Sequence, residues 1–232
     1  DYVKASDLQP YAGELMHYFN TFIALSSNDS AEEVRRFVDS IASTENLSNV
    51  LAICMRESIR GIVLYLLEDF DRAVAAFDIC EKVRLHQMFA GNSKVAAFYF
   101  YFGMSCVRLL SSPECKDRSL IRQRLDRCRK CVRVFAAMSP LNGGGMQLTL
   151  DAAALALKEG ASSRVVRMLE QASDDSRRDG YYHVEAIAAE TLAMNLQKSV
   201  RPWVAYGPWS RALAAYQRWG LLFKSREIEP RL

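Results

Sequence analysis

Residues 61–80 read GIVLYLLEDFDRAVAAFDIC, which places small and large apolar residues at regular distances along two successive helices. Small residues such as Gly61 and Ala73 let two antiparallel helices approach each other closely, and a large residue such as Phe77 fills the space between them. The anchor positions of this unit are Gly61, Leu64, Ala73, Phe77 and Cys80. The stretch therefore predicts a helix–turn–helix unit.

The same offsets recur along the chain. Complete copies begin at Ala153 and Ala193, and a degenerate copy begins at Gly103. These anchors are farther apart than the roughly 34 residues of a tetratricopeptide (TPR) repeat, so the units are lengthened. Four copies predict an all-α fold, a right-handed α-solenoid of TPR-like helix–turn–helix repeats, with about five helix pairs and a short terminal helix.

Helical periodicity and turn residues place the individual helices, and no alternating run predicts a strand. Leu15, Phe19 and Phe22 mark a first helix, and Val34, Val38 and Ile41 mark a second. The later helices are expected at 47–67, 71–88, 93–111, 146–158, 162–178, 181–198 and 202–219. A charged helix that follows the one at 93–111 is expected to end at about 137. The strongest break is SPLN followed by Gly143–Gly145, so we expect a flexible linker at 139–145. Residues 1–232 form one TPR-like domain, with 139–145 as its possible point of subdivision.

Composition indicates a folded intracellular chain. Half of the residues are hydrophobic and a quarter are charged, which is typical of globular proteins. Five of the six cysteines lie in helical patterns, where a free thiol behaves as a small hydrophobic group. Asp1 opens directly into amphipathic sequence without a signal peptide, which favours a reducing, cytoplasmic location. The most apolar stretch, Val95 to Met104, is about half of the roughly 20 residues of a membrane span, so it predicts a buried helix.

Charge is distributed unevenly. Residues 1–90 carry 14 acidic and 8 basic side chains, whereas the remainder carries 13 acidic and 22 basic ones. The most basic segment, from Glu114 to Arg133, offers Arg122, Arg129, Lys130 and Arg133 as candidate contacts. A solvated helix face is the first interpretation, and an acidic protein partner is the alternative. Nucleic acid is disfavoured because no aromatic residues for base stacking are interleaved.

Candidate chemical motifs lack their required context. The glycines at 143–145 are followed by Met146 and Gln147 rather than by the Gly-Lys-Ser/Thr of a phosphate-binding loop. Cys128 and Cys131 form a C-x₂-C in mid-helix, where core packing is expected rather than zinc. The three histidines, His17, His86 and His183, lie on separate expected helices. Glu185 and Glu190 diverge on their helix, which is poor geometry for acid–base catalysis. We expect no catalytic residue, metal, cofactor or small-molecule ligand.

Three segments resemble motifs of the helical-repeat region in large multidomain signalling kinases. Residues 183–190, HVEAIAAE, resemble that family's HEEALANE helix. Residues 216–220, YQRWG, followed by Lys224, resemble its YxxWGAxxK ending, and residues 97–101, AFYFY, resemble its aromatic AEFYFY helix. The resemblance covers roughly residues 89–229. Two departures are Val184, which replaces a glutamate, and Gly207-Pro208, which interrupts the last large helix.

This resemblance implies a regulatory or scaffolding role. In that family a kinase-like domain and an AAA-type ATPase precede the repeats, and GAF and often histidine-kinase domains follow them. The sequence thus predicts a non-catalytic protein-interaction scaffold of a larger signalling protein. The alternatives are a free-standing TPR adaptor for a hydrophobic or acidic peptide or helix, and an enzyme with an unrecognised site.

In TPR-type repeats the first helix of each pair lines the concave face, so the anchor offsets predict which residues point inward. They are Met55, Ile62, Tyr65, Leu66, Phe100, Met104, Val107, Leu150 and Met194. These positions are mainly apolar, unlike a groove that clamps a terminal carboxylate. Either the superhelix winds tightly enough to bury this face, or a hydrophobic helix of a partner or neighbouring domain fills it.

Overall fold

The computed structural model describes residues 30–42, 50–82, 93–198 and 202–232, and all regular elements in these ranges are helices. The α-helices are α2 (Ala31–Ala42), α3 (Val50–Leu66), α4 (Phe70–Lys82), α6 (Ser93–Ser111), α7 (Arg118–Met138), α8 (Pro140–Glu159), α9 (Ser163–Arg178), α10 (Tyr182–Gln197), α11 (Tyr206–Trp219) and α12 (Leu222–Ile228). Two short 3-10 helices are η1 (Pro202–Ala205) and η2 (Glu229–Arg231). The prediction of an all-α fold is confirmed.

Most expected helices agree with the observed ones. The helix expected at 93–111 is α6, and those expected at 162–178 and 181–198 are α9 and α10 to within one residue at either end. Val34 and Val38 are buried on α2, as their spacing predicts. The first expected helix, marked by Leu15, Phe19 and Phe22, lies outside the described residues.

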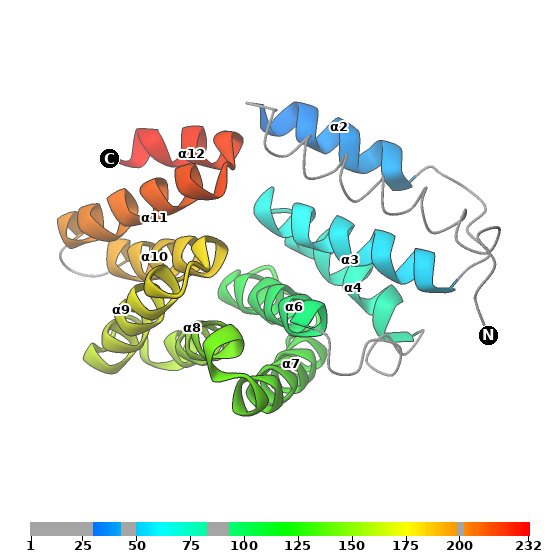
Figure 1. The fold of residues 1–232 in the computed structure, drawn as a ribbon, viewed down its shortest axis with the longest axis horizontal. Coiled ribbons are helices and arrows are strands. Elements are labelled where there is room, and N and C mark those ends of the chain that lie inside the picture. The colour runs from blue at the N-terminus through cyan, green and yellow to red at the C-terminus, as the bar shows by residue number, and fades with distance from the viewer. Residues whose placement is uncertain (1–29, 43–49, 83–92, 199–201) are drawn as a thin grey trace.

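Consecutive helices pack against each other, and the resulting pairs follow one another around an arc (Figure 1). The pairs are α3 with α4, α6 with α7, α8 with α9, and α10 with α11. Helix α6 also contacts α8, and α8 also contacts α10. The helices α6, α8 and α10 therefore form a continuous inner layer, against which α7, α9 and α11 pack.

Two glycines at predicted anchor positions permit close helix approach. A Cβ atom at Gly61 would lie 2.6 Å from the ring of Phe77, and one at Gly103 would lie 2.8 Å from the side chain of Leu150. Ala153 and Ala193 occupy the equivalent positions of the later units and are completely buried. Because a larger side chain would collide at these points, the anchors hold α3 close to α4 and α6 close to α8.

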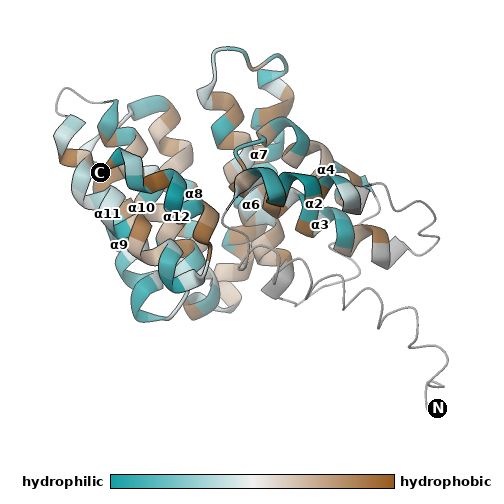
Figure 2. Cartoon of the chain, turned by 90° about the horizontal axis from the view of Figure 1, so that it is seen from above, coloured by the Kyte–Doolittle hydropathy of each residue, from teal (hydrophilic) through white to brown (hydrophobic). Residues whose placement is uncertain are grey.

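Helix α6 forms the centre of the hydrophobic core. Its Phe98 and Phe102 rings lie 5.2 and 5.3 Å from the ring of Phe77 on α4, between ring centroids. The prediction that Val95 to Met104 is part of a buried helix is confirmed. Figure 2 shows polar and apolar residues side by side on most helices, as expected of helices with one buried face. Among the described helices, none combines the length and the apolarity of a membrane span.

The predicted flexible linker at 139–145 is wrong. Helix α7 ends at Met138 and α8 begins at Pro140, so the three glycines lie in the first turns of a helix. Gly143 is buried against α7, where a Cβ would lie 2.8 Å from the Cα of Ala136. The helix propensity of glycine is low, but the close packing of α7 on α8 requires a residue without a side chain and overrides that preference.

The helix expected at 202–219 divides into η1 and α11. Pro208 is the third residue of α11, where a helix has no backbone hydrogen bond to lose. The Gly207-Pro208 pair therefore does not kink a helix interior. The pair lies just after the chain changes from 3-10 to α geometry. The α-helix therefore begins at Tyr206, about one turn later than the expected start at 202.

The neighbouring glycines of α8 give a matched test of this packing. We expect Gly143→Ala to destabilise the fold by about 1–3 kcal/mol, because the added methyl group overlaps the backbone of Ala136. Gly144→Ala should stabilise the fold by about 0.5–1 kcal/mol. A Cβ atom at this position would meet no neighbouring group within 4 Å, and alanine favours the helix more than glycine does. Urea unfolding followed by circular dichroism measures both. Equally small effects of the two substitutions would contradict the helical packing.

Candidate functional site

Most residues predicted to line a concave face are buried. The buried ones are Tyr65, Leu66, Phe100, Met104, Val107 and Leu150. Met55, Ile62 and Met194 are partly exposed. Phe100 is 0 % and Leu66 is 1 % exposed, so these two belong to the core between successive helices rather than to an open surface.

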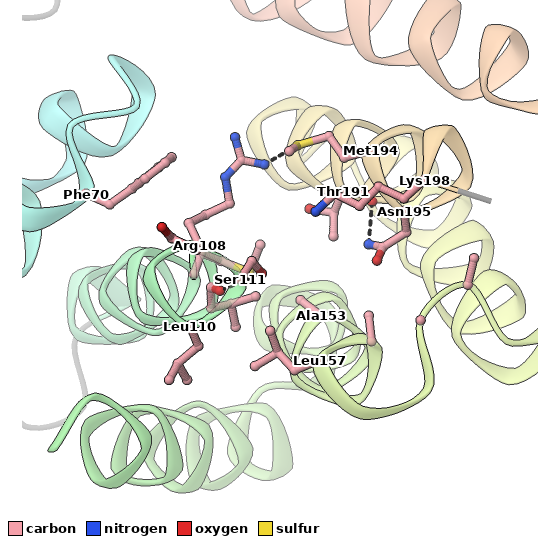
Figure 3. A pocket seen from close by; sticks show the side chains of 16 residues that line it. Phe70, Arg108, Leu110, Ser111, Ala153, Leu157, Thr191, Met194, Asn195 and Lys198 are labelled. Atoms are coloured by element: carbon pink, nitrogen blue, oxygen red, sulfur yellow. Dashed lines mark hydrogen bonds between the residues drawn. The ribbon is translucent and has the colours of Figure 1, made fainter. Parts of the chain in front are cut away.

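A groove with a volume of about 550 Å³ remains where the C-terminal ends of α6, α8 and α10 meet (Figure 3). Its apolar wall includes Met104 and Val107 of α6, Leu157 of α8 and Met194 of α10, and Phe70 of α4 lies at one side. Three of these residues are predicted concave positions. The volume lies within the roughly 300–1,000 Å³ that is typical of ligand pockets. This groove is the candidate functional site.

Among the residues that the structure describes, the charged side chains that line the groove are Arg108 and Lys198, and none of the lining residues is a carboxylate. The guanidinium of Arg108 stacks on the Phe70 ring, 5.0 Å from its centroid. Arg108 Nη2 donates a hydrogen bond to Glu68 Oε1 over 3.1 Å, and Arg108 Nη1 donates to the thioether sulfur of Met194. The groove is thus apolar along its wall and positive at two points.

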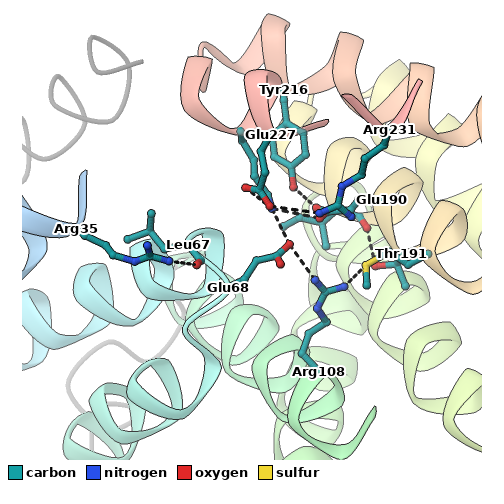
Figure 4. Close-up of polar contacts among 12 residues, drawn as sticks. Arg35, Leu67, Glu68, Arg108, Glu190, Thr191, Tyr216, Glu227 and Arg231 are labelled. Atoms are coloured by element: carbon teal, nitrogen blue, oxygen red, sulfur yellow. Dashed lines mark hydrogen bonds and ion pairs between the residues drawn. The ribbon is translucent and has the colours of Figure 1, made fainter. Parts of the chain in front are cut away.

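A buried cluster of charged side chains lies beside the groove and shares Arg108 with it (Figure 4). Lys224 Nζ lies 3.0 Å from Glu68 Oε1, 3.3 Å from Glu190 Oε1 and 3.3 Å from Glu227 Oε2, and its side chain is 3 % exposed. The hydroxyl of Tyr216 donates a 2.5 Å hydrogen bond to Glu190 Oε2. The cluster therefore joins the α3–α4 turn, α10, α11 and α12.

The cluster keeps Glu190 and Lys224 ionised. Burial by itself raises the pKa of Glu190, but Lys224 and Arg108 lower it to below the ordinary value of 4.5. Burial likewise lowers the pKa of Lys224, but Glu190 and the other carboxylates raise it above 10.5. Because the pKa of Glu190 is lowered by folding, its contribution to stability is present at neutral pH and is lost as the pH falls below 4.5. The contribution of Lys224 is lost as the pH rises above 10.5.

The two C-terminal segments that carry the family resemblance pack against each other. The contacts between them include His183 with Trp219 (ring centroids 5.8 Å apart), Glu185 with Arg218 (2.6 Å) and Glu190 with Tyr216 (2.5 Å). Gly220, at φ 86°, ends α11 and turns the chain into α12. This turn brings Lys224 to Glu190, so the motif residues form one contact region between α10, α11 and α12.

His183 packs among aromatic rings at the start of α10. It lies in the first turn of α10 and packs among the rings of Tyr101, Tyr181 and Trp219. Burial lowers the pKa of His183 to about 4, so the imidazole is neutral at physiological pH. It acts as an aromatic packing group. The other two histidines, His17 and His86, lie outside the described residues.

The basic helix is partly an intramolecular ion-pair surface. Arg129 Nε and Arg133 Nη2 donate to Asp151 Oδ1 over 2.8 and 2.9 Å, although the side chain of Arg133 is still 50 % exposed to solvent. Two further arginines of α7 pair with α4: Arg124 with Asp78 and Arg127 with Glu81. Arg122 and Lys130 are exposed, as predicted. The sequence could not show that α4 and α8 present acids to this face.

Cys128 is completely buried in the core, which confirms that it packs on the apolar side of α7, and Cys131 is half-buried. All six cysteines are free thiols. Within the described part of the chain, no three His, Cys, Asp or Glu side chains are grouped to hold a metal ion.

Among the described lining residues of the groove, the ionisable side chains are Arg108 and Lys198. Glu185 and Glu190 point to different partners, Arg218 and Lys224, as their helical spacing predicts. Comparison of the chain with models of protein families, with curated proteins and with solved structures finds no match in any of the three. The groove is therefore interpreted from its own geometry.

Burial of the inner helices is testable at Phe100. We expect Phe100→Asp to destabilise the fold by about 4 kcal/mol or more, because it places an unpaired charge in the core. Leu141→Asp is the matched control, since Leu141 is 72 % exposed and should tolerate the same change within about 0.5 kcal/mol. Thermal unfolding measures both. A fully stable Phe100→Asp protein would show that the helix faces are assigned wrongly.

The charge cluster should depend on Lys224. We expect Lys224→Met to destabilise the fold by about 3–5 kcal/mol, because it leaves buried carboxylates without their cation. Adding Glu190→Gln should recover part of this loss, because the deepest unpaired charge is then removed as well. Lys130→Met, at an exposed position of α7, is the control in chemical denaturation. Equal effects of the two lysine substitutions would contradict a structural role of the cluster.

Proposed function

We propose that this chain is a non-catalytic, TPR-like scaffold of a larger signalling protein, whose groove holds a segment of a partner protein or of a neighbouring domain. One observation carries the proposal. The groove is lined by α6, α8 and α10, which are the first helices of three successive pairs and which contact each other along the inner layer. In a right-handed TPR-like solenoid, the first helices of the pairs line the concave, partner-binding surface.

The repeat interpretation is supported by the anchors. Gly61, Gly103, Ala153 and Ala193 all lie at tight packing points, although the units are longer than a standard TPR repeat. Repeats of this kind bury a continuous core by stacking and leave one extended face for binding. The groove is the part of that face that remains open.

The signalling context rests on the family resemblance. The residues of the HEEALANE-like and YxxWG-like segments contact each other, which gives a physical reason for their joint occurrence in one chain. The free thiols support a reducing, cytoplasmic location.

The size of the groove limits what enters it. A volume of about 550 Å³ accommodates a few side chains rather than a whole helix. Burial of apolar surface contributes roughly 25 cal/mol per Å², and the partly exposed side chains of Leu157 and Met194 provide such surface in the groove. We therefore expect a short apolar segment, anchored by its side chains, as the partner.

A phage-displayed library of random peptides tests this function. We expect enrichment on the wild-type protein of peptides whose binding is weakened about tenfold or more by Leu157→Asp, since that change places a charge on the apolar wall. Fluorescence anisotropy with the enriched peptides measures the affinities.

Leu141→Asp, which adds the same charge outside the groove, is the control and should leave binding unchanged. No enrichment above that on an unrelated helical protein, or equal binding to wild type and Leu157→Asp, would refute the proposed function.

A further inference from the structure

We propose that Arg108 binds a carboxylate of the segment held in the groove, so that the partner is an acidic peptide with apolar side chains next to the acid. This inference rests on the proposed function of the groove and goes further by naming the chemistry of the partner. It is carried by the hydrogen-bond partners of Arg108 and by the charges that line the groove.

The two amino groups of the Arg108 guanidinium have acceptors of different strength, while the nearby carboxylate of Glu190 acts on the charge of the whole group. Its Nη2 donates to the carboxylate of Glu68, whereas its Nη1 donates to the thioether sulfur of Met194. A thioether is a weak acceptor, and a charged N–H bond to a carboxylate is much stronger. Met194 is also flexible and unbranched, so its sulfur can move aside for a ligand oxygen. The Nη1 edge is therefore the point where a carboxylate would gain most.

The guanidinium is held in place before a ligand arrives. It stacks on the ring of Phe70 (Figure 3) and is bound at Nη2 by Glu68, and its side chain is 15 % exposed. Binding to such a preorganised cation costs little ordering entropy. Partial burial also strengthens the attraction for an anion, because solvent screening is reduced.

The charges around the groove favour an acid. Lys198, at the end of α10, is the second cation of the lining, and the described part of the lining contains no carboxylate. Outside the lining, Glu68 shares its Oε1 atom between Arg108 and Lys224, and the buried carboxylate of Glu190 also acts on the charge of Arg108. A basic segment would meet two cations and is disfavoured by like-charge repulsion.

The peptides enriched from the library are the probes. We expect them to be rich in Asp and Glu beside apolar residues, and replacement of those acids by Asn and Gln should weaken binding about tenfold or more. Arg108→Gln should remove this difference between acidic and neutral peptides, whereas Arg108→Lys should retain part of it. Lys198→Gln, at an exposed position, should reduce the difference and serves if Arg108→Gln fails to fold by circular dichroism.

Arg122→Gln is the matched control, because it removes the same charge from an exposed position of α7 outside the groove. If neutral and acidic peptides bind equally well and remain sensitive to Leu157→Asp, the groove function stands and the acidic anchor is refuted. If Arg122→Gln rather than Arg108→Gln abolishes the preference for acids, the anchor is refuted in favour of the basic helix. If no peptide is enriched, the proposed function fails and this inference fails with it.

Discussion

The ion pairs of Lys224 are the constraint on which the closure of the helical arc depends. They join α12 to the turn between α3 and α4, which lies 156 residues earlier in the chain. An ammonium group that is almost completely buried is costly unless carboxylates compensate it, and three of them do so here. Together with the buried side chains of Phe223 and Ile228, these ion pairs hold α12 against the preceding helices.

The same cluster shapes the groove. Glu68 accepts hydrogen bonds from both Lys224 and Arg108, so the residue that closes the arc also orients the guanidinium at the groove. The Nη2 edge of Arg108 is thereby occupied, and its other edge faces Met194. The groove that we propose as a binding site therefore borders a buried network in which both Glu68 and Glu190 interact with Lys224 and Arg108.

Anchor offsets along the sequence identified part of the candidate site. They placed Met104, Val107 and Met194 on the inward side of their helices, and all three line the groove. The same offsets also selected Phe100, which a neighbouring helix covers completely. Helical periodicity gives the direction of a side chain but not the proximity of the next helix, so it cannot separate a groove wall from a core. The partners of Arg129 and Arg133 were missed for the same reason, because Asp151 lies on another helix.

The sequence by itself determined the fold class, most helix boundaries and the anchors at Gly61 and Gly103, because propensity, periodicity and side-chain size act over short distances along the chain. Only the tertiary structure decided the helical state of Gly143–Gly145, which depends on the close contact of α7 with α8. It alone also decided the cluster around Lys224 and the groove beside it. Both depend on side chains far apart in sequence, whose burial and ion pairing arise only when the helices have packed.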